Sequence, residues 1–506
     1  MICGQKIRFS VTLRATLRNA KISNFFEKSD RPSLKFSRPK HTTAKMAAMS
    51  RGRQGRVFKV SKPKKSTPSS RRHHFESFSE RIAKLKIDPI RRERRYLDDD
   101  TSSQASYFKT SFDEWRDLNL SEDFTSFSRD IQSLCESLPQ ILHYEDRIMD
   151  LLVAYIEKHN ALSLEPLLNL VAQFAHDLGA RFEKHFSRAV MVVSRVAASH
   201  PDVEVIEWSF TCLAWLFKYL SKLLVQDLRP LYDLISPLLG GEQQKPFVVR
   251  FAAESLSFLI RKAGMIYHRD DKPLKLIIRH IISDLDSEPT KKNQISLYQD
   301  GVSALFYESM RGVQRGLHSS ADVVFQTILD SVLDPTLVEP TKDQMSPVLR
   351  MADSVLIALI HHTDVSTFEP LFDVVIKQVR EWRESLKVSH IEYATRLLFV
   401  IVGVRQGTRI QKWDQVLDSI ASLVIWIDDI GANFSSRATS GALYTLALCL
   451  QTSPLDALLP HVRLLDRVTT GLWKQHFLDF TYFFAELGAS RFQSLLLPQF
   501  QRYDTH

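Results

Sequence analysis

Clustered lysines and arginines near the amino terminus are the residues whose type and spacing best suit a chemical role, the binding of phosphate. Arginine presents a flat fork of donors that fits phosphate oxygens, and lysine presents a compact charge. The candidate RNA- or phosphate-binding residues are Lys62, Lys64, Lys65, Arg71, Arg72, Arg91, Arg92, Arg94 and Arg95. The clusters at 62–65 and 71–72 are also of the kind that nuclear import receptors bind, so an import receptor is an expected partner.

The last four of these cations, which we call the arginine quartet, share one side of an expected helix. The arginine quartet consists of Arg91, Arg92, Arg94 and Arg95. At about 100° per residue its members fall within an arc of roughly 160°, while Ile90 and Leu97 lie on the opposite side. One side of that helix would therefore pack while the other presents guanidinium groups. A solvated charged face without a ligand is the alternative.

The net charge of +9 is unevenly divided along the 506 residues. Residues 1–97 hold 27 Lys and Arg and 6 Asp and Glu, a net charge of +21, so the remainder carries −12. Residues 49–74 are polar, basic and broken by proline, which is typical of a flexible arm. Such a block usually binds nucleic acid, an acidic partner, an import receptor or an anionic membrane surface. A solvated tail that only keeps the chain soluble is the alternative.

Motifs for catalysis, cofactors or metals are missing from the sequence. It has no G-x-x-x-x-G-K-[ST], G-x-G-x-x-G, G-x-S-x-G or H-E-x-x-H motif, which excludes the familiar phosphate cradles, nucleophile elbows and zinc helices. The four cysteines include no C-x-x-C pair, which excludes a disulfide framework and the usual zinc spacings. No run of about 18 apolar residues occurs. We therefore expect no enzyme, no cofactor, no small-molecule substrate and no membrane partner.

Residues 75–120 are expected to form short helices that lead into a longer array. Ser77 and Glu80 stand three residues apart, as in a capping box, and predict a helix that stops before Pro89. Asp88 could then cap a second helix that has Pro89 at its first position.

Residues 121–506 read as a succession of amphipathic helices, and glycine and proline are too scarce for an all-β fold. The segment from Glu204 to Leu224 is apolar nearly all round, so it must be covered on most sides. Its four aromatic residues are interpreted as core residues and not as a platform for bases; they are Trp208, Phe210, Trp215 and Phe217. A narrow polar stripe remains on this segment, formed by Glu204, Glu207, Thr211, Lys218 and Lys222.

Internal similarity indicates a repeated structure. Residues 164–169, 228–233 and 368–373 share one pattern, in which proline would stand in the first turn of a helix. Residues 249–256 are like the second helix of a HEAT repeat, and 437–443 form a looser copy. Helix pairs of irregular period predict an all-α fold, a HEAT/armadillo-like α-solenoid of stacked antiparallel pairs, whose curved surface binds other macromolecules.

Several unusual strings resemble the family of small-subunit processome component 20, also called the DRIM family. The strings are residues 75–82 (FESFSERI), 87–89 (IDP), 115–119 (WRDLN), 135–140 (CESLPQ), 164–186 and 207–219. The resemblance runs from about residue 75 to the end of the chain. It implies a large nucleolar HEAT-repeat scaffold in the snoRNA-guided particle that assembles the small ribosomal subunit, needed for pre-rRNA processing and 18S rRNA maturation. It brings no catalytic residue.

The partners that this resemblance implies are pre-rRNA, the snoRNA-containing processome and other processome proteins, and the implied location is the nucleus and nucleolus. A HEAT-type transport or adaptor protein that binds only proteins is the alternative function. A pure adaptor has no evident use for a charge of +21 at one end, which favours the RNA-binding scaffold.

The chain departs from the family at both ends. Family members are several times longer, so residues 121–506 are expected to be an array truncated at its carboxyl end. Residues 1–48 have no counterpart in the family and are expected to be disordered or an extension of the gene model, with translation starting at Met46 or Met49. Residues 1–45 also have the composition of a mitochondrial transit peptide, a reading that the family resemblance disfavours.

Overall fold

The computed structural model contains helices and no strand in the residues it describes. The described residues are 73–90, 106–240, 245–285, 292–332, 347–385, 387–408, 410–430, 436–461 and 493–494. Within them a single β-bridge joins Arg311 to Leu317. The predictions for residues 1–72, which include most of the basic arm, lie outside these ranges.

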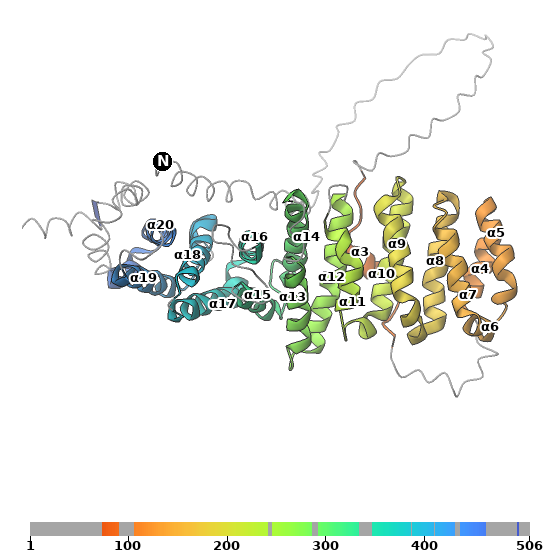
Figure 1. The fold of residues 1–506 in the computed structure, drawn as a ribbon, viewed down its shortest axis with the longest axis horizontal. Helices are drawn as coiled ribbons and strands as arrows, with labels where there is room; N and C mark the ends of the chain where they lie inside the picture. Colours follow the sequence, from red (N-terminus) through yellow and green to blue (C-terminus); the bar gives the residue numbers. More distant parts are fainter. Residues whose placement is uncertain are drawn as a thin grey trace, which may run out of the picture.

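The helices stack in two rows along the length of the molecule (Figure 1). Within each row, neighbouring helices come in the order of the chain. Row A contains α5 (Glu122–Ile131), α7 (Glu145–Ile156), α9 (Glu183–Ser199), α11 (Arg229–Ile235), α13 (Lys272–Asp284), α15 (Ala321–Ser331), α17 (Val365–Glu384), α19 (Trp413–Ile430) and α21 (Leu455–Leu458). Row B contains α4 (Tyr107–Leu118), α8 (Ala161–Leu178), α10 (Val203–Leu224), α12 (Pro246–Ile266), α14 (Lys292–Met310), α16 (Pro347–His362), α18 (Val388–Gly403) and α20 (Ser436–Thr452).

Short helices complete the array. They are α3 (Phe78–Lys84), α6 (Leu138–His143) and the 3-10 turns η2 (Gln132–Leu134), η3 (Gly179–Phe182), η4 (Ser236–Leu239), η5 (Val404–Gly407) and η7 (Leu459–His461). Because the row A helices from α5 to α19 also pack against row B helices, the apolar faces of both rows meet in one continuous core. The predicted all-α solenoid is thereby confirmed.

Polar bonds between successive row A helices show the register of the stack. The bonds Lys184–Asp146, Arg188–Asp150 and Arg195–Glu157 join α9 to α7, and each spans 38 residues. A constant offset means that the two helices run parallel. Further along row A the corresponding bonds span 47 residues between α11 and α13 and 39 between α17 and α19. Offsets of this size match HEAT-type repeats, which are about 40–47 residues long. We call the three α7–α9 pairs the ion-pair ladder.

The predicted buried helix at Glu204 to Leu224 corresponds to α10 and is confirmed. Phe210 and Phe217 are fully buried, and Trp208 and Trp215 are half-buried and pack against the core. The interpretation of these four aromatics as core residues therefore holds.

Two of the three proline predictions are wrong. Pro230 lies in the first turn of α11, as expected. Pro166 and Pro370 instead lie inside α8 and α17. α8 begins earlier because the Asn160 side chain accepts a hydrogen bond from the Leu162 amide and so caps the helix more than a turn upstream of the proline.

The predicted helix after Asp88 does not begin at Pro89. The helix opened by the Ser77–Glu80 capping box is confirmed as α3, but residues 85–90 are not helical. The amide of Ile90 donates to the carbonyl of Tyr219 in α10, at 2.8 Å. This bond to the array takes the place of a local helical turn, and the remainder of the predicted helix lies outside the described residues.

Candidate nucleic-acid interface

All nine predicted phosphate-binding residues lie outside the described residues, but the segment between them is described. This segment, residues 73–90, follows Arg72 directly and ends just before Arg91. It lies against α10 and α12 in row B, where Figure 1 shows α3 beside them. We call residues 73–90 the strap. Both ends of the strap, which adjoin the predicted cationic clusters in sequence, are thus fixed on the array.

Aromatic side chains anchor the strap. Phe75 stacks on Phe247, with ring centroids 4.1 Å apart. Phe78 is 1% exposed, and its ring lies edge-on to Phe251 at 5.5 Å and tilted against Phe258 at 5.4 Å. Burial of one large apolar side chain contributes about 1.5–3 kcal/mol, so each of these two residues should stabilise the docked strap by about that amount.

A carboxylate holds the amino end of α3. The Phe78 amide donates to Glu254 of α12 at 2.6 Å, and Glu254 also accepts from Arg250 at 2.7 Å. The Ser77 amide and hydroxyl donate to the Glu80 carboxylate, and the Glu80 amide donates back to the Ser77 hydroxyl. Negative charge at a helix amino terminus is favourable, so these two carboxylates orient α3 against α10 and α12.

The polar stripe of α10 is the surface on which the strap lies. Arg81, which is 4% exposed, forms an ion pair with Glu207. Lys218 donates to the carbonyls of Ile82 at 2.9 Å and Leu85 at 2.6 Å, at the carboxyl end of α3. The sequence showed this stripe but not its partner. The one polar stripe on an otherwise apolar helix indicated that a further segment docks on that stripe.

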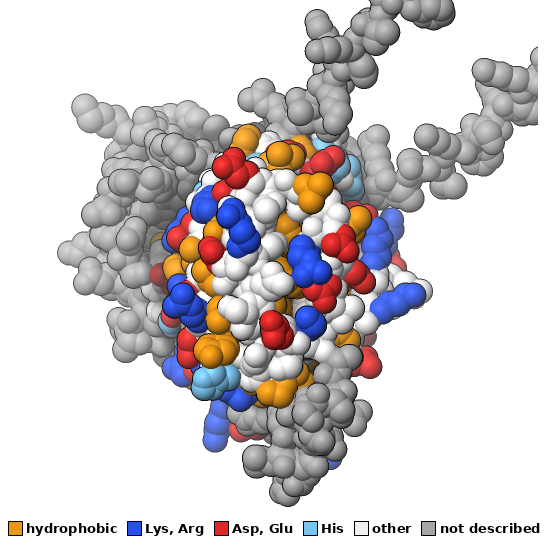
Figure 2. Space-filling view, turned by 90° about the vertical axis from the view of Figure 1, so that its right-hand side faces the viewer, with side chains coloured by type: hydrophobic (Ala, Val, Ile, Leu, Met, Phe, Trp, Pro, Cys, Tyr) orange, Lys and Arg blue, Asp and Glu red, His pale blue; other side chains and the backbone are white. Residues whose placement is uncertain are grey.

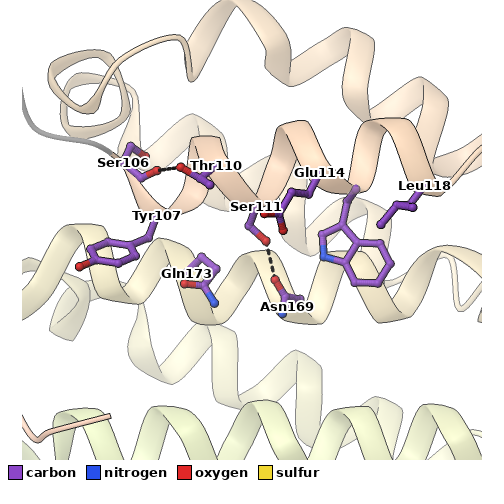
Figure 3. Close-up of a pocket in the computed structure, with 9 residues that line it drawn as sticks. Ser106, Tyr107, Thr110, Ser111, Glu114, Leu118, Asn169 and Gln173 are labelled. Atoms are coloured by element: carbon purple, nitrogen blue, oxygen red, sulfur yellow. Dashed lines mark hydrogen bonds between the residues drawn. The ribbon is translucent and has the colours of Figure 1, made fainter. Parts of the chain in front are cut away.

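An open groove lies between α4 and α8 of row B (Figure 3). Its volume is about 540 Å³, and it is lined by Ser106, Tyr107, Thr110, Ser111, Glu114, Trp115, Leu118, Asn169 and Gln173. The Ser111 hydroxyl donates to the Asn169 side chain at 2.7 Å. The lining offers hydroxyls, amides, aromatic surface and one carboxylate but no cation, so it is unsuited to phosphate.

The end of the array near α4 to α7 carries mixed charge. Figure 2 shows acidic and basic side chains interspersed with hydrophobic ones over this face. A polyanion is attracted by a surface of one sign. This end therefore has no electrostatic preference for nucleic acid.

Buried ionisable groups in the described ranges have structural roles. Burial raises the pKa of Asp177, which accepts hydrogen bonds from the Ser106 hydroxyl and the Tyr107 and Phe108 amides at the start of α4. Burial raises the pKa of Cys135 to about 11 and that of Cys212 to about 12, which makes both thiols poor nucleophiles. No group of His, Cys, Asp and Glu within the described parts of the chain could hold a metal ion. No described helix is long and apolar enough to cross a membrane.

Two curated proteins, both named U3 small nucleolar RNA-associated protein 20, are similar to the chain. The protein of Saccharomyces cerevisiae is 32% identical over 436 residues, and that of Schizosaccharomyces pombe is 30% identical over 439. The matches cover 85% and 86% of this chain but 16% of each relative. The family resemblance seen in the sequence is thereby confirmed.

The other comparisons add no family. No protein-family model matches the chain. Among solved structures, an engineered protein covers 75% of the chain at 13% identity with a TM-score of 0.22, and 99% of that protein is covered. A likeness this low supports no argument about fold or function.

Proposed function

Because the chain is a family relative of U3 small nucleolar RNA-associated protein 20, we propose that it is a non-enzymatic scaffold of the small-subunit processome. In this role it binds pre-rRNA, snoRNA-containing particles and other processome proteins, and it supports pre-rRNA processing and 18S rRNA maturation. The observation that carries the proposal is the similarity to both named relatives over more than four fifths of this chain.

The fold and the charge support the RNA-binding part of this proposal. Stacked helix pairs provide long surfaces for macromolecules. The strap lies between the predicted cations in the sequence, and both of its ends are bonded to α10. The His73 ring lies 2.9 Å from the Glu207 carboxylate at one end, and the Ile90 amide donates to the Tyr219 carbonyl at the other. The nine candidate residues would then bind phosphates from a fixed base on row B.

A transport or adaptor protein that binds only proteins is the second candidate function. The groove between α4 and α8 favours it, because its lining offers aromatic and amide groups without a cation. The charge of +21 in residues 1–97 favours the RNA-binding scaffold.

The proposed location is the nucleus, and within it the nucleolus, with an import receptor bound through the basic clusters. A fluorescent fusion of the full chain should accumulate in nucleoli. Mitochondrial accumulation that depends on residues 1–45 would overturn this location.

Crosslinking of the tagged protein to RNA in cells, followed by sequencing of the bound RNA, tests the proposed function. The scaffold proposal predicts enrichment of pre-rRNA and small nucleolar RNA over messenger RNA. Recovery of proteins without crosslinked RNA would favour the adaptor.

A further inference from the structure

Two lysines, Lys222 of α10 and Lys262 of α12, lie near each other at the carboxyl ends of these helices, and Lys86 follows in sequence a strap residue that is bonded to α10. The ammonium of Lys262 lies 3.4 Å from the hydroxyl of Ser221, the residue before Lys222. Lys86 follows Leu85 in the strap, and the Leu85 carbonyl accepts a hydrogen bond from Lys218. Lys218 lies one helical turn before Lys222 in α10. We call Lys86, Lys222 and Lys262 the lysine cluster.

The lysine cluster lacks acidic partners in the described part of the chain. No carboxylate there lies within 4 Å of any of its three ammonium groups. Burial, together with the nearby charges of Lys222 and Lys218, lowers the pKa of Lys262. Lys218 itself is engaged by two carbonyls of the strap. Since the remaining positive charges repel one another, a bound anion would relieve that repulsion.

We propose that the lysine cluster binds the phosphate backbone of RNA, as a contact on the helical array separate from the basic arm. Two exposed lysines and one half-buried lysine present compact charges with free donors, which suits contact with phosphates without reading of bases. This inference rests on the proposed function for the identity of the ligand, and it adds a site on α10 and α12.

The position of the arginine quartet favours RNA over an acidic protein. Ile90 is bonded to Tyr219, which lies between Lys218 and Lys222 in α10, and the quartet begins at the next residue. Ile90, the residue that precedes the quartet in sequence, is therefore held beside the lysines of α10. A nucleic acid strand carries a charge at every nucleotide, so one strand can engage both groups in succession.

The test measures the salt dependence of binding of a short labelled oligouridine to the full chain. Neutralising Lys222→Gln and Lys262→Gln together should make the slope of log K against log salt shallower by about 1.4, because each lost phosphate contact on a single strand changes it by about 0.7. The matched control, Lys275→Gln with Lys377→Gln, removes two exposed row A lysines that lie beside Asp271 and Glu381. The control slope should stay unchanged.

The outcomes separate this site from the proposed function. An unchanged slope in the Lys222/Lys262 variant, with RNA still bound, overturns the lysine cluster and leaves the arm as the RNA contact. Failure of the unmodified chain to bind the oligouridine overturns both proposals. Binding of polyglutamate that is as strong as that of the oligouridine, and equally reduced in the variant, assigns the cluster to an acidic protein and overturns RNA as its ligand.

Discussion

The strap and the ion-pair ladder both join segments that are distant in sequence, but they do so by different means. The ladder links α7 to α9 through pairs such as Arg188–Asp150, whose side chains are 44% and 61% exposed. The strap links residues 73–90 to α10 and α12 through Phe78, at 1% exposure, and Arg81, at 4%. Water screens the ladder but is excluded from the buried side chains of Phe78 and Arg81. We therefore expect the ladder to specify the register of α9 on α7 while contributing little free energy. The contacts of the strap should contribute much more free energy to its docking.

The energies expected of the two regions differ several-fold. Exposed ion pairs contribute about 0–1 kcal/mol each. Truncating a buried phenylalanine costs about 3–5 kcal/mol. Substitutions in the strap should therefore release it, while substitutions in the ladder should leave the array intact.

The largest effect is expected from Phe78→Ala. The variant removes a ring packed against Phe251 and Phe258, so local stability of the strap should fall by about 3–5 kcal/mol. Hydrogen exchange of the α3 amides should accelerate by at least about a hundredfold. As a control, Phe124→Ala removes an equally buried ring in α5 and should leave α3 exchange unchanged. Equal acceleration in both variants would show that the strap and the array open together.

A smaller effect is expected from Glu254→Gln. The amide cannot match the charge-assisted bonds that the carboxylate accepts from the Phe78 amide and Arg250, so α3 should lose about 1–3 kcal/mol. The same exchange measurement reports it. Glu114→Gln, at an exposed position of α4, is the control and should have no effect on α3. An unaltered exchange rate in Glu254→Gln would mean that the aromatic anchors alone orient the helix.

A pH effect separates the capping box from the aromatic anchors. Hydrogen bonds from the Ser77 amide and then its hydroxyl lower the pKa of Glu80 below its ordinary value. A lowered folded-state pKa contributes stability at pH values above the ordinary pKa, and this contribution is lost as pH falls through the lowered pKa. The carbon-13 shift of the Glu80 carboxyl should therefore titrate at lower pH than in Ser77→Ala. Coincident titrations would contradict the capping role of Ser77.

The smallest effect is expected from Arg188→Gln in the ladder. Its partner Asp150 is exposed, so the free energy of unfolding should change by less than about 0.5 kcal/mol. A double-mutant cycle with Asp150→Asn, measured by urea unfolding, gives the pair energy directly. A coupling energy above about 2 kcal/mol would mean that a ladder pair contributes as much free energy as the contacts of the strap, which would contradict the difference between the two regions.

Local features of the fold were predictable from the sequence, and long-range ones were not. The Ser77–Glu80 box and the apolar periodicity of α10 depend on residues within one or two turns, and both predictions are confirmed. The bond between the Phe78 amide and Glu254 spans 176 residues, and no local pattern specifies which carboxylate meets which helix. The prediction of a helix at Pro89 was wrong for the same reason, because Ile90 bonds to a distant carbonyl.

The candidate interface was predictable in its chemistry but not in its position. Charge counting identified the arm, and the polar stripe on α10 marked a docking surface. Lys86, Lys222 and Lys262 were not recognised as a group because they come from three separate segments. Only the docking of the strap brings Lys86 to the carboxyl end of α10.

RNA phosphate binding is proposed for the basic arm and the arginine quartet, and not for the ion-paired cations of row A. It is tested most directly by the salt slope of oligouridine binding in two variants of the full chain, each with four cations changed to Gln. One variant changes the arginine quartet, and the other changes Arg181, Lys184, Arg188 and Arg195, which pair with acids of α7. We expect a slope shallower by up to about 3 for the arginine quartet and an unchanged slope for the row A variant. Equal changes in both variants, or no change in either, would contradict it.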